Sequence, residues 1–348
     1  MDTNKPRLLL TRRIPQPGPE LLHEVFEVVG GEADEALERA ALLERVVGVD
    51  AILCLLSETI DAQVMDAAGP CLRVISNMAV GYDNIDVPAA TARGIIVTNT
   101  PDVLTDATAD LAWALILAVA RRVLEGDRFV REGHFRAWSP FMLLGRLVAG
   151  ATLGIVGMGR IGQAVARRAL GWNMKVLYVR QRGPLSSQEI PPGADWECCA
   201  TLEELLARSD IVSLHVPLTD KTRHLIGERE LALMKPGAFL INTARGPVID
   251  EAALVRALQE GRLGGAGLDV YEREPELTEG LDELLNVVLL PHLGSATVET
   301  RSRMAELAAR NAVAAIRGER IPHVVNPEVL PRSGGGGGKP AGTREGNG

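Results

Sequence analysis

Residues 151–162 read ATLGIVGMGRIG, and this stretch decides the fold. Its apolar, partly β-branched beginning predicts a buried β-strand, and residues 163–170 after it predict a helix with small apolar side chains. Gly157 allows a tight turn, Gly159 lets the backbone approach a pyrophosphate, and Gly162 lets the helix pack close to the strand. The helix N-terminus adds free N–H groups. The stretch therefore predicts a dinucleotide site, with an ordinary strand–helix turn as the alternative.

The composition is that of a globular chain long enough for two domains. Of its 348 residues, 46% are hydrophobic and 24% are charged. The net charge of −8 argues against a nucleic-acid or membrane-surface partner. We expect no secretory signal or membrane span, because the most apolar stretch, residues 111–120, is about half the required length. The four cysteines lack metal-binding spacing, so we expect reduced thiols, no metal site and a cytoplasmic location.

Strand and helix signals alternate along the chain, which predicts parallel sheets. The expected fold class is α/β, with two Rossmann/flavodoxin-like doubly wound parallel-sheet domains and a cleft between them. Before the glycine motif, strands are predicted at residues 7–11, 50–56, 72–76 and 95–98, and helices at 20–26 and 61–68. After it, strands are predicted at 175–179, 211–215, 238–242, 265–269 and 287–290, and helices at 202–208, 228–234 and 251–259.

Two long helical stretches are predicted to join the domains. Residues 106–132 form one of them, with Thr105 or Asp106 as its cap, and residues 297–317 form an amphipathic helix that returns the chain to the first unit. The predicted domains are therefore a discontinuous substrate-binding domain (1–103 plus 293–330) and a dinucleotide-binding domain (104–292). The last residues, 331–348, are almost without apolar side chains and are predicted to be a disordered tail.

An irregular segment, residues 133–150, carries several large apolar side chains, among them Phe135, Trp138 and Phe141. So many apolar residues in a loop indicate a surface covered by the other domain or by a second subunit. A locally packed loop is the alternative.

The strand at 175–179 ends in Arg180, Gln181 and Arg182, where an acidic residue would mark NAD. A carboxylate would repel a 2′-phosphate, whereas a guanidinium can pair with it. We therefore expect a preference for NADP(H), with NAD(H) possible. Two solvated surface arginines are the alternative interpretation.

Polar residues follow three strands of the second domain. Arg245 follows the strand at 238–242, Glu272 and Glu274 follow Asp269, and His292 follows the strand at 287–290. Ligands of Rossmann-type sheets bind beyond the carboxyl ends of the strands. A lone loop arginine or histidine is more often solvated or structural, but three such groups at one edge predict acid–base chemistry.

At this point several long motifs resemble one family. They are AVGYDNIDV (79–87), GMGRIG (157–162), HVPLTDKTRHLI (215–226), MKPGAFLINTARGPVID (234–250), GLDVYEREP (267–275) and PHLGSAT (291–297). The chain resembles the D-isomer-specific 2-hydroxyacid dehydrogenases over about residues 6–327. Within that family it is most similar to the glyoxylate and hydroxypyruvate reductases, because of SETIDAQVMDAA (57–68), Trp138 with Ser139 and Pro140, and Arg180 to Arg182.

The resemblance implies the site residues. The implied catalytic residues are Arg245, Glu274 and His292. The implied substrate contacts are Leu56, Val80, Gly81, Trp138, Arg245 and His292. The implied dinucleotide contacts are Thr105, Gly157, Met158, Gly159, Arg160, Ile161, Gly162, Arg180, Gln181, Arg182, His215, Val216, Pro217, Thr222, Thr243, Ala244, Arg245, Asp269, His292, Gly294 and Ser295.

The implied reaction is NAD(P)H-dependent reduction of a small 2-oxo acid, glyoxylate or hydroxypyruvate, to glycolate or D-glycerate. His292 would be the general acid, with Glu274 favouring its imidazolium form. Asp269 would orient the nicotinamide or ribose, or else only cap a strand end. The resemblance also implies a homodimer through the dinucleotide-binding domains, with residues 133–150 reaching toward the neighbour's active site. The alternatives are a 2-ketogluconate or other 2-oxo acid reductase, and a non-enzymatic, dinucleotide-sensing, corepressor-like protein.

Overall fold

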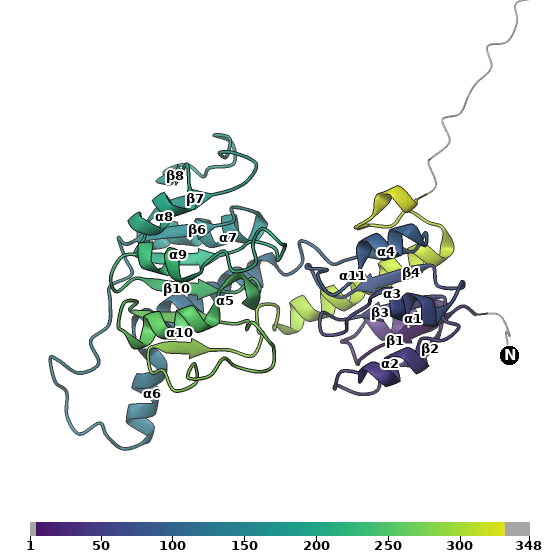
Figure 1. Cartoon of the computed structure of the whole chain (residues 1–348), viewed down its shortest axis with the longest axis horizontal. Helices are drawn as coiled ribbons and strands as arrows, with labels where there is room; N and C mark the ends of the chain where they lie inside the picture. Colours follow the sequence, from purple (N-terminus) through teal and green to yellow (C-terminus); the bar gives the residue numbers. More distant parts are fainter. Residues whose placement is uncertain (1–4, 331–348) are drawn as a thin grey trace, which may run out of the picture.

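The computed structural model describes residues 5–330, and it contains two α/β domains, each built on a parallel sheet (Figure 1). One sheet has five strands in the order β2-β1-β3-β4-β5, and the other has seven in the order β12-β11-β10-β9-β6-β7-β8. The strand pairs within both sheets are parallel. The predicted fold class is confirmed. The tail predicted at 331–348 lies outside the described residues.

The five-stranded sheet is built from short apolar runs that are covered on both faces, as in most parallel sheets. Every residue of β3 and β4 is buried. The sheet contains β1 (Arg7–Leu10), β2 (Glu27–Gly30), β3 (Ala51–Cys54), β4 (Val74–Asn77) and β5 (Ile96–Thr98). Its local helices are α1 (Gly18–Val25), α2 (Arg39–Arg45), α3 (Ala62–Ala68) and α4 (Val87–Ala92).

The seven-stranded sheet begins at the glycine motif. It contains β6 (Thr152–Val156), β7 (Lys175–Val179), β8 (Trp196–Cys198), β9 (Ile211–Leu214), β10 (Phe239–Asn242), β11 (Gly265–Leu268) and β12 (Val287–Leu289). Its α-helices include α7 (Arg160–Ala169), α8 (Leu202–Arg208), α9 (Glu228–Leu233) and α10 (Glu251–Gln259). Within residues 5–330, the 3₁₀ turns are η1 (Leu170–Trp172), η2 (Gly246–Val248) and η3 (Pro327–Val329). The predicted bounds of β7, α8 and α10 agree with the structure.

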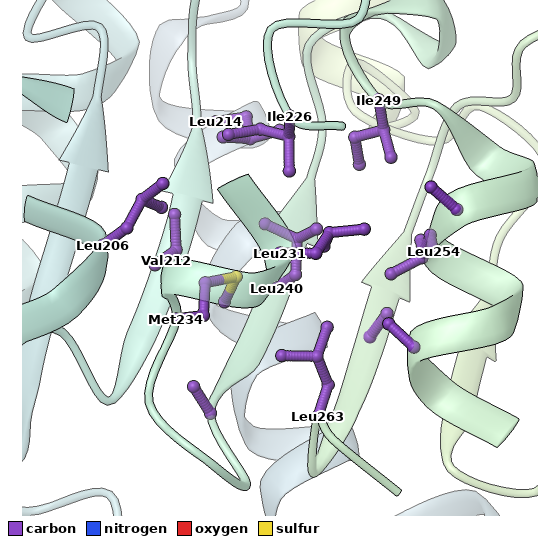
Figure 2. Packing of buried hydrophobic residues seen from close by; sticks show 14 of the residues in the cluster. Leu206, Val212, Leu214, Ile226, Leu231, Met234, Leu240, Ile249, Leu254 and Leu263 are labelled. Atoms are coloured by element: carbon purple, nitrogen blue, oxygen red, sulfur yellow. The ribbon is translucent and has the colours of Figure 1, made fainter. Parts of the chain in front are cut away.

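Aliphatic side chains fill one face of the seven-stranded sheet (Figure 2). Leu206 of α8, Leu231 of α9 and Leu254 of α10 meet Val212 of β9 and Leu240 of β10, and all five are essentially inaccessible to solvent. Fully burying a side chain of this size contributes roughly 1.5–3 kcal/mol. This packing gives the loops after β9, β10 and β11 a rigid base.

The stretch predicted as one helix over 106–132 is two helices, α5 (Thr105–Ala120) and α6 (Val123–Arg131). Arg122 lies between them with φ of +56°, a left-handed conformation that cannot continue a right-handed helix. The predicted cap is also corrected, because Leu104 occupies the N-cap position of α5 and no side chain caps it.

The two domains are joined by α11 (Val298–Arg317), which packs against α1 and the five-stranded sheet (Figure 1). Thr297 is its N-cap, and its hydroxyl accepts the N–H of Thr300. Four buried alanines on one face allow a close approach, and Ser76 Oγ of β4 donates to the Ala308 carbonyl at 2.8 Å. The four are Ala305, Ala308, Ala309 and Ala312.

The segment after α6 is irregular, as predicted, and projects with α6 from the seven-stranded domain (Figure 1). We call residues 133–147 the arm. Its Trp138 is 79% exposed and its Phe141 is 82% exposed. Within residues 5–330, no helix combines the length and apolar character needed to cross a membrane.

Candidate active site

A cleft lies where the carboxyl ends of strands from both sheets face each other. Its walls include the loop after β4, the segment that leads into α5, and the loops after β6, β9, β10, β11 and β12. Of the predicted site residues, the cleft is lined by Leu56, Val80, Gly81, Thr105, Gly159, Arg160, Ile161, His215, Val216, Pro217, Thr243, Ala244, Arg245, Asp269, His292, Gly294 and Ser295.

The glycine turn has the backbone geometry that its spacing predicts. Gly157 has φ of +99°, and a Cβ there would lie 2.5 Å from the His215 carbonyl oxygen. A Cβ on Gly162 would overlap with the Gly157 carbonyl, so the helix can approach the turn only because residue 162 lacks a side chain. Gly159 is the N-cap of α7 without a side-chain cap, and the space beside its Cα is open. The first N–H groups of α7 can therefore bind an anion.

The cleft also contains polar groups suited to a dinucleotide. Thr243 Oγ1 is buried and has no hydrogen-bond partner among residues 5–330, which fits a ligand that supplies one. Burial lowers the pKa of His215 to about 3, so its ring is neutral near pH 7. Arg160, within the glycine motif, pairs through Nε with Asp102 Oδ1 at 2.5 Å. Together with the open space at Gly159, these residues fit a bound dinucleotide.

Arg180 lies at the end of β7, and its side chain is 17% exposed. Its Nη1 is 3.6 Å from Oε1 of Glu189, whose other oxygen accepts the N–H and the hydroxyl of Ser186, both at 2.9 Å. Folding thus brings Glu189 close to Arg180, although no acidic residue directly follows this strand in the sequence. Gln181 and Arg182 are exposed beyond this strand end.

His292 and Glu274 form a pair at the cleft. Nδ1 of His292 is 3.0 Å from Oε2 of Glu274, and the other oxygen of Glu274 accepts the N–H of Tyr271 at 3.1 Å. Burial alone would raise the pKa of Glu274. The hydrogen bond and charge of His292, with the Tyr271 N–H and Arg245, bring that pKa below its usual value. Glu274 is therefore a carboxylate at neutral pH.

Asp269 holds the turn that presents His292. Its carboxylate accepts the N–H of Leu293 at 2.6 Å and that of Gly294 at 2.7 Å, and its carbonyl accepts the N–H of His292 at 3.0 Å. Burial raises the pKa of Asp269, while these N–H groups and the charge of His292 oppose the shift. His292 itself has φ of +56°, so this turn needs such support.

Arg245 reaches across the cleft to Asp83, which the sequence patterns did not single out. Nε of Arg245 donates to the Asp83 carboxylate at 3.0 Å, and Nη1 donates to the carbonyl of Ala244 at 2.9 Å. Nη2 lies against Gly81, where a Cβ would overlap with it. Asp83 could have been suspected only from its place in AVGYDNIDV, at the carboxyl end of β4.

Several predicted contacts do not line the cleft described by residues 5–330. The Thr222 hydroxyl donates to the Pro217 carbonyl at 2.6 Å within its own loop. Met158 is 1% exposed and belongs to the core, and Trp138 lies on the arm. The described chain contains no cluster of three or more His, Cys, Asp or Glu side chains placed to hold a metal ion.

Residues 113–294 match the family model described as "D-isomer specific 2-hydroxyacid dehydrogenase, NAD binding domain". The chain is 54% identical to the glyoxylate reductase of Thermococcus gammatolerans, covering 94% of this chain and 97% of that one. The glyoxylate reductase of Pyrococcus furiosus shows the same identity and coverage.

Solved structures agree with these matches. A glyoxylate reductase from Paecilomyes thermophila superposes with a TM-score of 0.82 at 36% identity, covering 94% of this chain and 100% of that one. An NADPH-dependent glyoxylate/hydroxypyruvate reductase from Sinorhizobium meliloti, in complex with NADP and malonate, has a TM-score of 0.80 at 36% identity, covering 95% and 100% of the two chains.

Proposed function

Because the chain belongs to the D-isomer-specific 2-hydroxyacid dehydrogenases, we propose that it reduces glyoxylate and hydroxypyruvate to glycolate and D-glycerate, with NADPH as the preferred reductant. The observation that carries the proposal is the pair of His292 and Glu274, 3.0 Å apart at a cleft that also contains Arg245. The relatives' names support the substrate, since those named glyoxylate reductase match along nearly the whole chain.

In this proposal, Arg245 binds the substrate carboxylate and polarises the 2-oxo group. Its Nη2 lies beside Gly81, so the backbone N–H groups of Val80 and Gly81 can bind the same carboxylate. A guanidinium suits this role because it presents several donors in one plane.

His292 donates the proton to the carbonyl oxygen, and it must be an imidazolium to do so. Glu274 favours that charged form through the 3.0 Å contact, and Asp269 fixes the turn that carries the ring. A bound nicotinamide dinucleotide supplies the hydride for the carbonyl carbon. Closure of the two domains over the substrate would limit the access of water to these groups.

A spectrophotometric assay tests this function. Oxidation of NADPH is followed with glyoxylate, hydroxypyruvate, 2-ketogluconate and arylpyruvates, in wild type and in His292→Gln. We expect turnover with glyoxylate and hydroxypyruvate, and a loss of about 10²-fold or more in kcat for the variant. Preference for a larger acid would indicate another 2-oxo acid reductase. No turnover with any acid, together with tight dinucleotide binding, would indicate the sensor class.

We propose that Arg180 and Arg182 give the preference for NADP(H). The other dinucleotide and substrate contacts that the family resemblance implies are proposed as well. The support is that Arg180 is the guanidinium at the end of β7, that its side chain is largely buried, and that its ion-pair partner Glu189 is 3.6 Å away. Arg180→Ala should weaken NADPH binding far more than NADH binding, as measured by the two dissociation constants. Equal weakening would contradict the assignment.

The domain boundaries remain 1–103 with 293–330 for the substrate-binding domain, and 104–292 for the dinucleotide-binding domain. Packing supports them, because α5 packs on α7 and β11, whereas α11 packs on α1 and β4. Limited proteolysis that cuts both within 99–105 and near 292 should release a fragment of about residues 104–292. The four cysteines carry no disulfide in the described chain, which supports a cytoplasmic location.

We also propose a homodimer through the dinucleotide-binding domains, with Trp138 reaching the neighbour's cleft. Leu144 and Leu147 of the arm are 62% and 79% exposed, and Leu285 near the arm's base is 68% exposed. Large exposed apolar patches mark interaction surfaces. Sedimentation of wild type and of a variant with Phe141→Ser and Leu147→Ser tests this. A wild-type monomer would refute the proposal.

A further inference from the structure

A buried carboxylate outside the cleft braces the segment that carries Glu274. Glu251 is the first residue of α10, and it is only 2% exposed. The reaction proposed above makes no use of it. Burying a carboxylate is unfavourable unless hydrogen bonds compensate, so the partners of Glu251 indicate its role.

Those partners stand on either side of Glu274 in the chain. One oxygen of Glu251 accepts the N–H of Glu272 at 2.7 Å, and the other accepts the hydroxyl of Thr278, also at 2.7 Å. Burial raises the pKa of Glu251, while the Thr278 hydroxyl and the Glu272 N–H act in the opposite direction. The two bonds fasten both ends of the segment 272–278 to the start of α10.

Other polar contacts of the segment are the bond from the Tyr271 N–H to Glu274 and one from the Glu276 N–H to the Arg273 carbonyl at 2.8 Å. Residues 273–277 are all exposed, so hydrophobic burial does not hold them. Glu272 adds a second anchor, because its side chain is 2.7 Å from Nε2 of His224. Tyr271 before the segment and Leu281 after it are buried in the core, so the exposed residues between them depend on such polar anchors to keep one position.

The start of α10 also connects this segment with the turn that follows Arg245. The turn after Arg245 packs so closely on the Glu274 segment that a Cβ on Gly246 would overlap with the backbone of Tyr271. This turn leads directly into α10 and Glu251. The Arg245 turn and the Glu274 segment are therefore held together from both sides.

We propose that Glu251 is a positioning residue, which holds Glu274 at hydrogen-bonding distance from His292. The inference rests on the proposed reductase function, since it assigns a purpose to the His292–Glu274 contact. Asp269 and Arg245 are the other charged groups near this pair. When the anchor is lost, Glu274 moves away from His292 and stabilises the imidazolium less, so the activity that needs the imidazolium falls first at high pH.

The test compares disruptive and conservative variants of the full-length chain. Glu251→Ala removes both acceptors, whereas Glu251→Gln can still accept from the Glu272 N–H and donate to Thr278 Oγ1. Thr278→Val removes only the hydroxyl, and Thr278→Ser keeps it. Glu228→Ala is the matched control, because Glu228 is the first residue of α9 and its side chain is 86% exposed.

We expect Glu251→Ala to lower kcat for glyoxylate by about 10- to 100-fold, as misplacement of a catalytic group by about 1 Å can do. The alkaline limb of the pH profile, which is the high-pH range where kcat falls as the pH rises, should move to lower pH. Thr278→Val should show a smaller change of the same kind. Glu251→Gln, Thr278→Ser and Glu228→Ala should stay close to wild type, and the dissociation constant of NADPH should not change.

If Glu251→Ala has the kcat and the pH profile of wild type, the inference is overturned. It is also overturned if Glu251→Ala has a lower kcat but the alkaline limb of its pH profile lies where it does in wild type. If Glu251→Ala does not fold, Thr278→Val against Thr278→Ser decides in the same way. A wild-type chain that reduces no 2-oxo acid would contradict the proposed function instead. In that event, the inference can still be tested by NMR titration of the His292 ring. If the titration midpoint is the same in wild type and in Thr278→Val, the inference is overturned.

Discussion

Replacing Glu274 by glutamine should move the alkaline limb of the reduction to lower pH while leaving the fold intact. The glutamine side-chain oxygen can still accept from Nδ1 of His292, so the ring keeps this partner, whereas the negative charge and the bond from the Tyr271 N–H are lost. Reduction needs the imidazolium, and the carboxylate 3.0 Å away stabilises it. Without that charge the imidazolium is stabilised less, so activity is lost at a lower pH on the alkaline side.

The geometry sets the expected size of this shift. A hydrogen bond to a charged group contributes about 1.5–3 kcal/mol and one between neutral groups about 0.5–1.5 kcal/mol, so losing the charge costs about 1–2 kcal/mol, or about 1–1.5 pH units. The two side chains are 27% and 32% exposed, so solvent screening favours the lower end, about one unit. Between the old and the new limb, kcat/KM should fall by up to about 10-fold, whereas at low pH the variant should approach the wild-type rate.

The assay is the pH dependence of kcat/KM for glyoxylate at saturating NADPH. The control is Glu276→Gln, an exposed glutamate of the same segment. A variant with reduced kcat/KM at every pH and an unmoved alkaline limb would refute the electrostatic role of Glu274. A control that shifts the limb equally would show that the net charge of the segment matters, rather than the contact with His292.

Three further variants test other parts of the site and fold. Asp83→Ala removes the partner of Arg245 Nε and should lower kcat/KM for glyoxylate by about 10- to 100-fold, with NADPH binding unchanged; a change within two-fold would contradict this. Asp269→Asn leaves one N–H of the His292 turn without an acceptor, so kcat and Tm should both fall, and an unchanged Tm would argue against this bracing role. Glu58→Ala should lower the free energy of unfolding by about 3 kcal/mol in urea titrations, because it leaves Arg12 and buried donors unpaired; a loss below about 1 kcal/mol would show that water replaces the carboxylate.

Much of the fold could be predicted from local sequence patterns. Parallel strands that are buried on both faces appear as continuous apolar runs, and the bounds of β7, α8 and α10 follow from such runs and their flanking polar residues. The edge strands β2 and β8 escaped prediction because they are short and only partly buried. The break at Arg122 escaped too, because a left-handed residue in a helical sequence has no compositional signal when it is not glycine.

The sequence by itself determined the glycine turn and the strand ends that carry Arg245, Glu274 and His292. Parallel topology brings such ends to one edge, so their grouping follows from the order of strands alone. Only the tertiary structure decided which oxygen each donor meets. Asp83 pairs with Arg245 from 162 residues away, and Glu251 anchors the segment of Glu274 through two bonds of 2.7 Å. Such contacts depend on how separately folded segments pack against each other, and no local pattern of residues encodes that geometry.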